Sequence, residues 1–164
     1  MKLYVMRHGP AEDHADSGVD GDRALTAAGR KRVRSVATLL LEAGEAPRHV
    51  ITSSLVRAVQ TAEIVAFATN FDEHDGTVRV RSELAPGGNG AQLARHLASE
   101  GGRRVMIVGH EPDLSGLVST LCGASFGRAF EKAMVVGLHL ASDSDHAGIR
   151  FVLEPKMLRI ERAR

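Results

Sequence analysis

Two arginines and two histidines stand just beyond three short apolar runs of the sequence. Arg7 and His8 end the first run. Arg57 comes a few residues after the second run, and His110 comes after the third. Open α/β sheets build their ligand sites beyond the carboxyl ends of strands, so we expect these side chains to share a pocket. Guanidinium forks pair with phosphate oxygens, and neighbouring helix N-termini favour anions. The spacing therefore predicts a cationic pocket that suits a phosphoryl group.

The order of these residues along the chain resembles the histidine phosphatase superfamily. The matching segments are Arg7-His8-Gly9, Arg57-Ala58 followed by Gln60-Thr61-Ala62-Glu63, and Gly109-His110. Three more segments are similar to the small SixA-type phosphohistidine phosphatases of that superfamily: residues 23–29, 83–86 and 108–115. Ala24 and Ser54 depart from the pattern, because relatives usually carry Pro at these two positions. Neither departure removes a functional group.

The resemblance implies a phosphoglycerate mutase-like fold and a phosphatase that uses no cofactor and no metal ion. His8 is then the nucleophile that takes the phosphoryl group. A neutral imidazole, whose ordinary pKa is about 6.5, can attack through one ring nitrogen when an acceptor holds the other N–H. Arg7, Arg57 and His110 would hold the phosphoryl oxygens, where charge lies in the transition state. Water would then hydrolyse the phosphohistidine.

Three other residues are candidates for the site, and each has a second possible role. By the resemblance, Arg23 lies at the pocket rim and binds the phosphate or the incoming partner; its alternative is a salt bridge to Asp20 or Asp22. Glu83 matches the region where larger relatives hold a proton donor, which makes it a candidate catalytic acid, although a phosphohistidine leaving group needs little protonation. Ser53 is a candidate phosphate donor, or a plain helix cap.

The expected substrate is a phosphorylated protein that carries phosphohistidine. Only about a dozen residues separate the second expected helix from Glu83, whereas larger members of the superfamily cover the site with inserted segments. One alternative is a phosphatase or phosphomutase for a small phosphorylated metabolite. Another is a noncatalytic phosphate-sensing adaptor that keeps the arginines for binding.

Other kinds of phosphate chemistry find weak support in the sequence. Residues 20–22 resemble the first fragment of an aspartyl-phosphate motif, but they do not follow an apolar strand. Residues 13–14 resemble the end of a His-x-His-x-Asp-His metal motif, but Gly9 and Ala11 occupy the positions that need histidine. A nucleotide-binding P-loop is missing. We therefore expect no metal ligands in this chain.

The elements that must position these residues follow an α/β pattern, because short β-branched runs alternate with longer stretches of helical spacing. We expect one domain over residues 1–164, a sandwich with a mostly parallel central sheet flanked by helices. Strands are expected at 3–6, 49–52, 78–80 and 104–108, with a hairpin of 134–140 and 149–153 joined through 142–146. Helices are expected from the Thr26 cap to Gly44, at 55–68 with Ser53 and Ser54 as the cap, at 91–99 and at 111–121. The basic residues 156–164 are either a flexible tail or a docked edge.

The composition is that of an ordinary soluble globular protein. Lys and Arg number 21 against 20 Asp and Glu, and the chain has no Trp, so we expect no nucleic acid partner. A lone cysteine, Cys122, excludes an internal disulfide framework. No apolar run is long enough to span a bilayer, and the first residues do not read as a signal peptide. These features predict a cytoplasmic protein without a membrane partner, and they carry no indication of oligomeric state.

Overall fold

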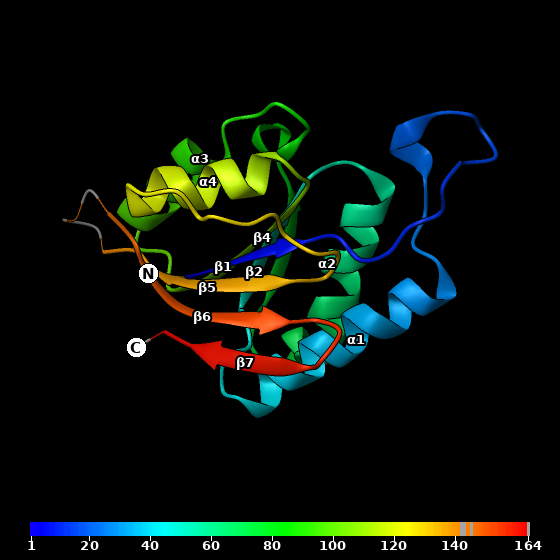
Figure 1. Ribbon diagram of the computed structural model, residues 1–164. Helices are drawn as coiled ribbons and strands as arrows, with labels where there is room; N and C mark the ends of the chain where they lie inside the picture. The colour runs from blue at the N-terminus through cyan, green and yellow to red at the C-terminus, as the bar shows by residue number, and fades with distance from the viewer. Residues whose placement is uncertain (142–143, 145, 164) are drawn as a thin grey trace.

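A single sheet of seven strands runs through the computed structural model, which describes residues 1–141, 144 and 146–163 (Figure 1). The strands are β1 (Lys2–Arg7), β2 (His49–Thr52), β3 (Thr77–Val80), β4 (Arg104–Gly109), β5 (Val135–His139), β6 (Gly148–Glu154) and β7 (Arg159–Arg162). Their order across the sheet is β3-β2-β4-β1-β5-β6-β7. The first four strands pair in parallel and the last three pair antiparallel. The predicted α/β sandwich is confirmed, and its sheet is mixed, with parallel pairing among β1 to β4 and antiparallel pairing of β5, β6 and β7.

Within the described residues, four helices cover the two faces of the sheet. They are α1 (Ala27–Glu42), α2 (Val56–Ala68), α3 (Gly90–Ser99) and α4 (Asp113–Cys122), and three short 3-10 turns accompany them: η1 (Asp20–Asp22), η2 (Phe71–Glu73) and η3 (Ser82–Leu84). Helices α1 and α2 lie on one face, whereas α3 and α4 lie on the other (Figure 1). No helix in the described part of the chain is long and apolar enough to cross a membrane.

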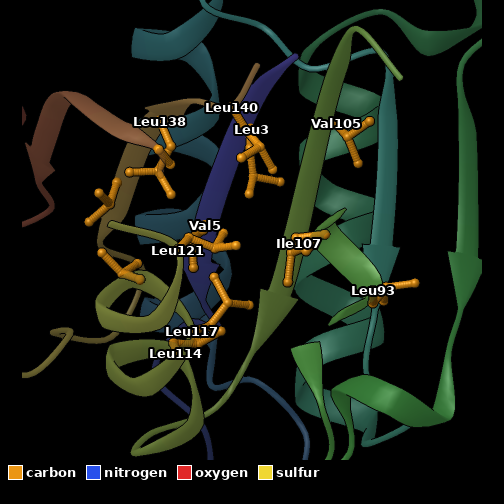
Figure 2. Close-up of a cluster of buried hydrophobic side chains, with 14 of the residues drawn as sticks. Leu3, Val5, Leu93, Val105, Ile107, Leu114, Leu117, Leu121, Leu138 and Leu140 are labelled. Atoms are coloured by element: carbon orange, nitrogen blue, oxygen red, sulfur yellow. The ribbon is translucent and has the colours of Figure 1, made fainter. Parts of the chain in front are cut away.

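The central strand β1 is buried on both faces because its side chains alternate between two apolar clusters. Leu3 and Val5 point toward α4 and belong to the first cluster, which also contains Leu117 and Leu121 of that helix (Figure 2). Tyr4 and Met6 point the other way, into the cluster formed by α1 and α2. Residues with no exposed surface on either side are typical of a parallel strand covered by two helical layers. This packing fixes the end of β1, where the first candidate residues lie.

The last third of the chain adds antiparallel strands to this sheet. The predicted hairpin is confirmed, because β5 and β6 pair antiparallel. Of its predicted connection, residues 142, 143 and 145 lie outside the described residues. Residues 159–162 form β7, which pairs with β6 at the edge of the sheet, and residue 164 lies outside the described residues.

The helix starts were predicted with mixed success. Thr26 caps α1 as predicted, since its hydroxyl oxygen accepts a hydrogen bond from the Gly29 N–H. The predicted cap of α2 is wrong. Leu55 holds the N-cap position there, without a side-chain hydrogen bond, and Ser53 turns instead toward another partner described below.

Candidate active site

The parallel strands β1, β4 and β2 end side by side, and each ends at a candidate residue. The His8 N–H donates to the Gly109 carbonyl at 3.1 Å, and the Ser53 N–H donates to the Val108 carbonyl at 3.1 Å. These bonds continue the ladder one residue beyond the strands and bring His8 beside His110, with ring centroids 5.1 Å apart. The grouping expected from the sequence is therefore present for these three residues.

His8 is a buried imidazole with one nitrogen engaged. Its Nδ1 lies 2.7 Å from the Gly9 carbonyl oxygen. A carbonyl only accepts, so Nδ1 carries the proton and Nε2 keeps its lone pair in the neutral ring. Burial lowers the pKa of His8 to about 3, and the positive charge of Arg57 acts in the same direction. The ring is therefore neutral at physiological pH, with Nε2 available as a nucleophile.

Gly9 allows this loop to lie close against α1. A Cβ atom at Gly9 would lie 2.5 Å from Val33 Cγ2, closer than packed side chains allow. The Gly9 N–H donates to Thr61 Oγ1 at 3.1 Å, and the Thr61 hydroxyl donates to the Arg57 carbonyl at 2.7 Å. The loop that carries His8 is thus tied through Thr61 to the helical turn that carries Arg57.

His110 and Ser53 form a buried polar pair. His110 Nε2 lies 2.8 Å from Ser53 Oγ, and that oxygen also accepts from the Leu55 N–H at 3.3 Å. Burial, followed by the charge of Arg57, lowers the pKa of His110 to about 4. Its Nδ1 is buried and has no hydrogen-bond partner among the described residues. One nitrogen of this ring is fixed by the protein and the other remains available for a ligand.

Arg7 and Arg57 are held by acceptors from distant segments. Arg7 Nη1 donates to the Phe130 carbonyl at 2.7 Å. The side chain of Arg57 is only 6% exposed, and it donates twice to Asp20, from Nη1 to the carbonyl at 2.9 Å and from Nη2 to Oδ2 at 3.1 Å. The Nε atoms of both arginines are buried without a partner among the described residues. Buried donors in this state are rare, and an oxyanion would satisfy them.

Arg23 forms one of the two salt bridges considered from the sequence, the one to Asp20. Its Nε lies 2.9 Å from Asp20 Oδ1, and its Nη1 donates to the Glu12 carbonyl at 3.1 Å. The same carboxylate contacts Arg57 through its other oxygen. The salt bridge thus also links Arg23 to Arg57 through the Asp20 carboxylate.

Glu83 lies in η3, after β3, and its carboxylate forms an ion pair with Arg81. The hydrogen bond from Arg81 lowers the pKa of Glu83 to about 2. The carboxyl group is therefore ionised at neutral pH. This pairing weighs against the proton-donor role that the sequence comparison implied for Glu83.

Several residues that shape the site carried little or no signal in the sequence. Thr61 was noticed only as part of a motif, although its position four residues after Arg57 puts both on one helical face. The sequence predicts Asp20 as a partner of Arg23 and offers it as part of a weak aspartyl-phosphate fragment, but it does not predict the contact with Arg57. The Phe130 carbonyl comes from the irregular stretch before β5, where no periodicity predicts which atom meets Arg7.

The family of the chain follows from comparison with known proteins. The chain belongs to the Histidine phosphatase superfamily (branch 1), whose model matches residues 3–85. It is 38% identical over 143 residues to an uncharacterized protein of Picosynechococcus sp., which covers 84% of both chains.

Within this superfamily the chain is similar to SixA, which confirms the resemblance drawn from the motifs. It is 27% identical to phosphohistidine phosphatase SixA of Escherichia coli K12 over 166 aligned positions, 99% of each chain. The structure of the protein histidine phosphatase SixA complexed with tungstate superposes with a TM-score of 0.86 at 26% identity. That match covers 97% of this chain and 100% of the other.

Proposed function

We propose that this protein is a phosphatase that transfers a phosphoryl group to His8 and then to water. The observation that carries the proposal is the state of His8: a neutral ring with its proton held on Nδ1 by the Gly9 carbonyl. Arg7 Nε, Arg57 Nε and His110 Nδ1 are buried and have no hydrogen-bond partner among the described residues, which supports a bound tetrahedral oxyanion beside His8. The tungstate bound to the SixA relative is an oxyanion of that shape.

The first step forms a bond between His8 Nε2 and phosphorus. The lone pair of Nε2 makes this bond, while the bond between phosphorus and the leaving atom of the substrate breaks and its electron pair departs with that atom. The Gly9 carbonyl stabilises the positive charge that the ring gains, through the Nδ1–H hydrogen bond. Donors from Arg7 and Arg57 stabilise the charge on the transferred oxygens, the main source of acceleration in phosphoryl transfer.

The second step returns the enzyme to its starting state. A water oxygen bonds to phosphorus as the bond to Nε2 breaks, and the electron pair of that bond returns to Nε2. The proton released by water leaves with inorganic phosphate or solvent. Neither step needs a cofactor, so the proposed reaction is metal-independent.

His110 takes part as a hydrogen-bond donor in this scheme. Ser53 Oγ accepts from the Leu55 N–H, and the proposal assigns the hydroxyl hydrogen of Ser53 to the hydrogen bond with His110 Nε2. The neutral His110 ring then carries its proton on Nδ1, the nitrogen without a partner among the described residues. Ser53 thus acts on the phosphoryl group through His110, instead of donating to it directly as first considered.

The substrate class we propose is a protein that carries phosphohistidine. Between α2 and α3 the chain forms only two short 3-10 turns and the strand β3, so this connection contributes no helical cover to the pocket. A site without an inserted helix from this connection suits a phosphoryl group borne on a large partner. The leaving imidazole of phosphohistidine is also a good leaving group, which fits a site whose Glu83 is ionised.

The test of the nucleophile is chemical trapping. Wild-type protein incubated with phosphoryl-labelled substrate and quenched without acid should carry label on His8. His8→Ala should lose turnover and label while keeping its circular dichroism spectrum, and His74→Ala, at an exposed loop histidine, should keep both. Label on another residue, or full turnover in His8→Ala, contradicts the proposed nucleophile. Binding of phosphate by the wild-type protein without any turnover would instead favour the adaptor alternative.

The test of substrate class is a comparison of kcat/KM across a panel. The panel contains phosphohistidine proteins, phosphoserine peptides, sugar phosphates and nucleotides. We expect the highest kcat/KM for a phosphohistidine protein. A sugar phosphate or nucleotide at the top of the panel would support the small-metabolite alternative instead.

Metal independence is tested by chelation. No group of three or more His, Cys, Asp or Glu side chains within the described residues is arranged to hold a metal ion. Dialysis against EDTA should therefore leave kcat unchanged. Activity that disappears on dialysis and returns with magnesium or zinc would contradict the proposed mechanism.

A further inference from the structure

Asp20 contacts both Arg57 and Arg23 on the outer side of the pocket. It lies in the segment between β1 and α1, which extends away from the sheet beyond the end of β1 (Figure 1). One carboxylate oxygen, Oδ1, lies 2.9 Å from Arg23 Nε. The other, Oδ2, accepts from Arg57 Nη2 at 3.1 Å, and the Asp20 carbonyl accepts from Arg57 Nη1 at 2.9 Å. A single residue therefore fixes both terminal nitrogens of Arg57.

The segment that carries Asp20 is itself held in register with the site. Its two ends meet in an antiparallel bridge between Ala11 and Leu25. The Leu25 N–H donates to Gln60 Oε1 at 2.8 Å, which ties this base to α2. Near the tip, the Ser17 hydroxyl donates to Asp22 Oδ2 at 2.7 Å. The position of Asp20 is thus set by the fold and not by its ion pairs alone.

Asp20 could either hold Arg57 in place or compete with the substrate for it. The geometry separates these roles. Asp20 engages the terminal end of the guanidinium, whereas Nε is the atom left buried without a partner among the described residues. A guanidinium has further N–H donors on both terminal nitrogens, so the edge that includes Nε remains able to bind an oxyanion. A competitor would occupy the donors that the substrate needs, and Asp20 leaves this edge open.

We propose that Asp20 is a positioning residue, which orients Arg57 and Arg23 as one unit for the phosphoryl group that His8 attacks. This inference rests on the proposed phosphatase function. Arg57 needs such a partner because its buried guanidinium lies close to the positive charge of Arg7. A carboxylate on its outer side offsets this repulsion and fixes the side chain in one orientation.

The experiment compares Asp20→Ala with Asp16→Ala. Both changes remove one negative charge from the same exposed segment, but Asp16 makes no hydrogen bond or ion pair within the described part of the chain. Asp20→Ala keeps the backbone carbonyl that holds Arg57 Nη1, so the fold of the segment should persist. Binding of inorganic phosphate is measured by calorimetry, and kcat and KM are measured with an aryl phosphate.

We expect Asp20→Ala to weaken phosphate binding about tenfold and to lower kcat by roughly tenfold to a hundredfold, as small misplacements of binding groups do. Asp20→Asn, which keeps one acceptor oxygen, should show a smaller loss of phosphate binding and of kcat than Asp20→Ala. In an Arg57→Ala background, the effect of Asp20→Ala on kcat and on phosphate binding should be clearly smaller, because only its contact with Arg23 remains to be lost. Asp16→Ala should match wild type.

Three outcomes would overturn the role of Asp20: wild-type binding and kcat in Asp20→Ala, tighter phosphate binding as expected of a competitor, or an undiminished effect in the Arg57→Ala background. Failure of the proposed function looks different. A wild-type protein that turns over no phosphorylated substrate refutes the phosphatase, while weaker phosphate binding in Asp20→Ala would still support the role of Asp20 in anion binding.

Discussion

At the scale of single residues, the proposed chemistry depends on two histidines that burial keeps neutral. The pKa values of His8 and His110 fall to about 3 and about 4, below the ordinary value of about 6.5 for an exposed imidazole. A neutral ring is the form that attacks phosphorus. The arginines supply the positive charge that the histidines do not carry, which separates the nucleophile from the groups that bind the anion.

These pKa values predict the pH dependence of the reaction. Because the free enzyme determines kcat/KM, that parameter should not fall between pH 8 and pH 5 once titration of the substrate itself is taken into account. An NMR titration of the two rings should find them neutral at pH 5. A fall with an apparent pKa near 6.5 would mean that the nucleophile is not buried as described.

The same shifts have a consequence for stability. Because the folded pKa lies below the unfolded one, the unfolded chain binds more protons between about pH 6.5 and pH 3. The contribution of His8 to stability is therefore complete above about pH 6.5 and decreases as the pH falls through this window. His8→Gln should lack the part of this pH dependence that is due to His8. Urea titrations of wild type and variant at pH 7 and pH 5 would measure the difference.

The two arginines that contact Asp20, Arg57 and Arg23, should differ in their effect on catalysis. The side chain of Arg57 is 6% exposed and that of Arg23 is 25% exposed. Arg57→Ala should lower kcat roughly a hundredfold, which corresponds to about 3 kcal/mol for one lost transition-state donor. Arg23→Ala should cost less with an aryl phosphate, and its KM for a phosphohistidine protein should rise if Arg23 contacts the partner. Equal losses in kcat for the two variants would contradict this order.

At the scale of elements, the site depends on how the turn after β1 meets the first turn of α2. Thr61 is fully buried and bridges the two, accepting from the Gly9 N–H and donating to the Arg57 carbonyl. Thr61→Val keeps the shape but leaves the Gly9 N–H without an acceptor. It should lower the free energy of unfolding by about 1–3 kcal/mol and should also reduce kcat.

The matched control is Thr61→Ser, which keeps the hydroxyl group and removes one methyl. It should retain most of the turnover lost in Thr61→Val. Chemical denaturation and steady-state kinetics measured on the same preparations separate the two effects. Equal turnover in both variants would show that the bridge does not position the catalytic groups.

The elements themselves were largely predictable, because each carries a local pattern. The β-branched runs predicted the strands, and the Thr26 cap predicted the start of α1. The proximity of His8 and His110 was predictable because the carboxyl ends of parallel strands meet at one edge of a sheet. The predicted cap role of Ser53 is wrong, because a serine before a helix is equally typical of a cap and of a buried hydrogen-bond partner. The contacts of Asp20 and Phe130 depend on irregular segments, whose course no periodicity records.

At the scale of the whole molecule, a second polar cluster lies at the opposite end of the sheet from the pocket. Glu45, which follows α1, is 4% exposed. Its carboxylate accepts from Lys2 at the start of β1, from the Tyr4 hydroxyl at 3.0 Å and from Arg150 on β6. Glu45 thereby connects the first helical layer, the central strand and the C-terminal hairpin.

Breaking this cluster should destabilise the protein without changing its chemistry. Glu45→Gln leaves Arg150 partly buried without its charge partner and should lower the free energy of unfolding by about 3 kcal/mol. The control is Glu154→Gln, which breaks an ion pair with Arg128, a side chain that is 43% exposed. That loss should cost about 0–1 kcal/mol. Below the melting temperature, kcat should match wild type in both variants, because the pocket lies at the other end of the strands.

The effect of Glu45→Gln should also depend on pH. Although burial alone would raise the pKa of Glu45, hydrogen bonds from Arg150 and Tyr4 lower it to about 2. A carboxyl with a depressed folded pKa stabilises the protein above its unfolded value of about 4.5, and this contribution disappears as the pH falls toward 2. The difference between wild type and Glu45→Gln, measured by urea denaturation, should be full at pH 6 and should shrink below about pH 4.5. A difference that stays constant down to pH 3 would mean that packing around residue 45, and not its charge, joins the three elements.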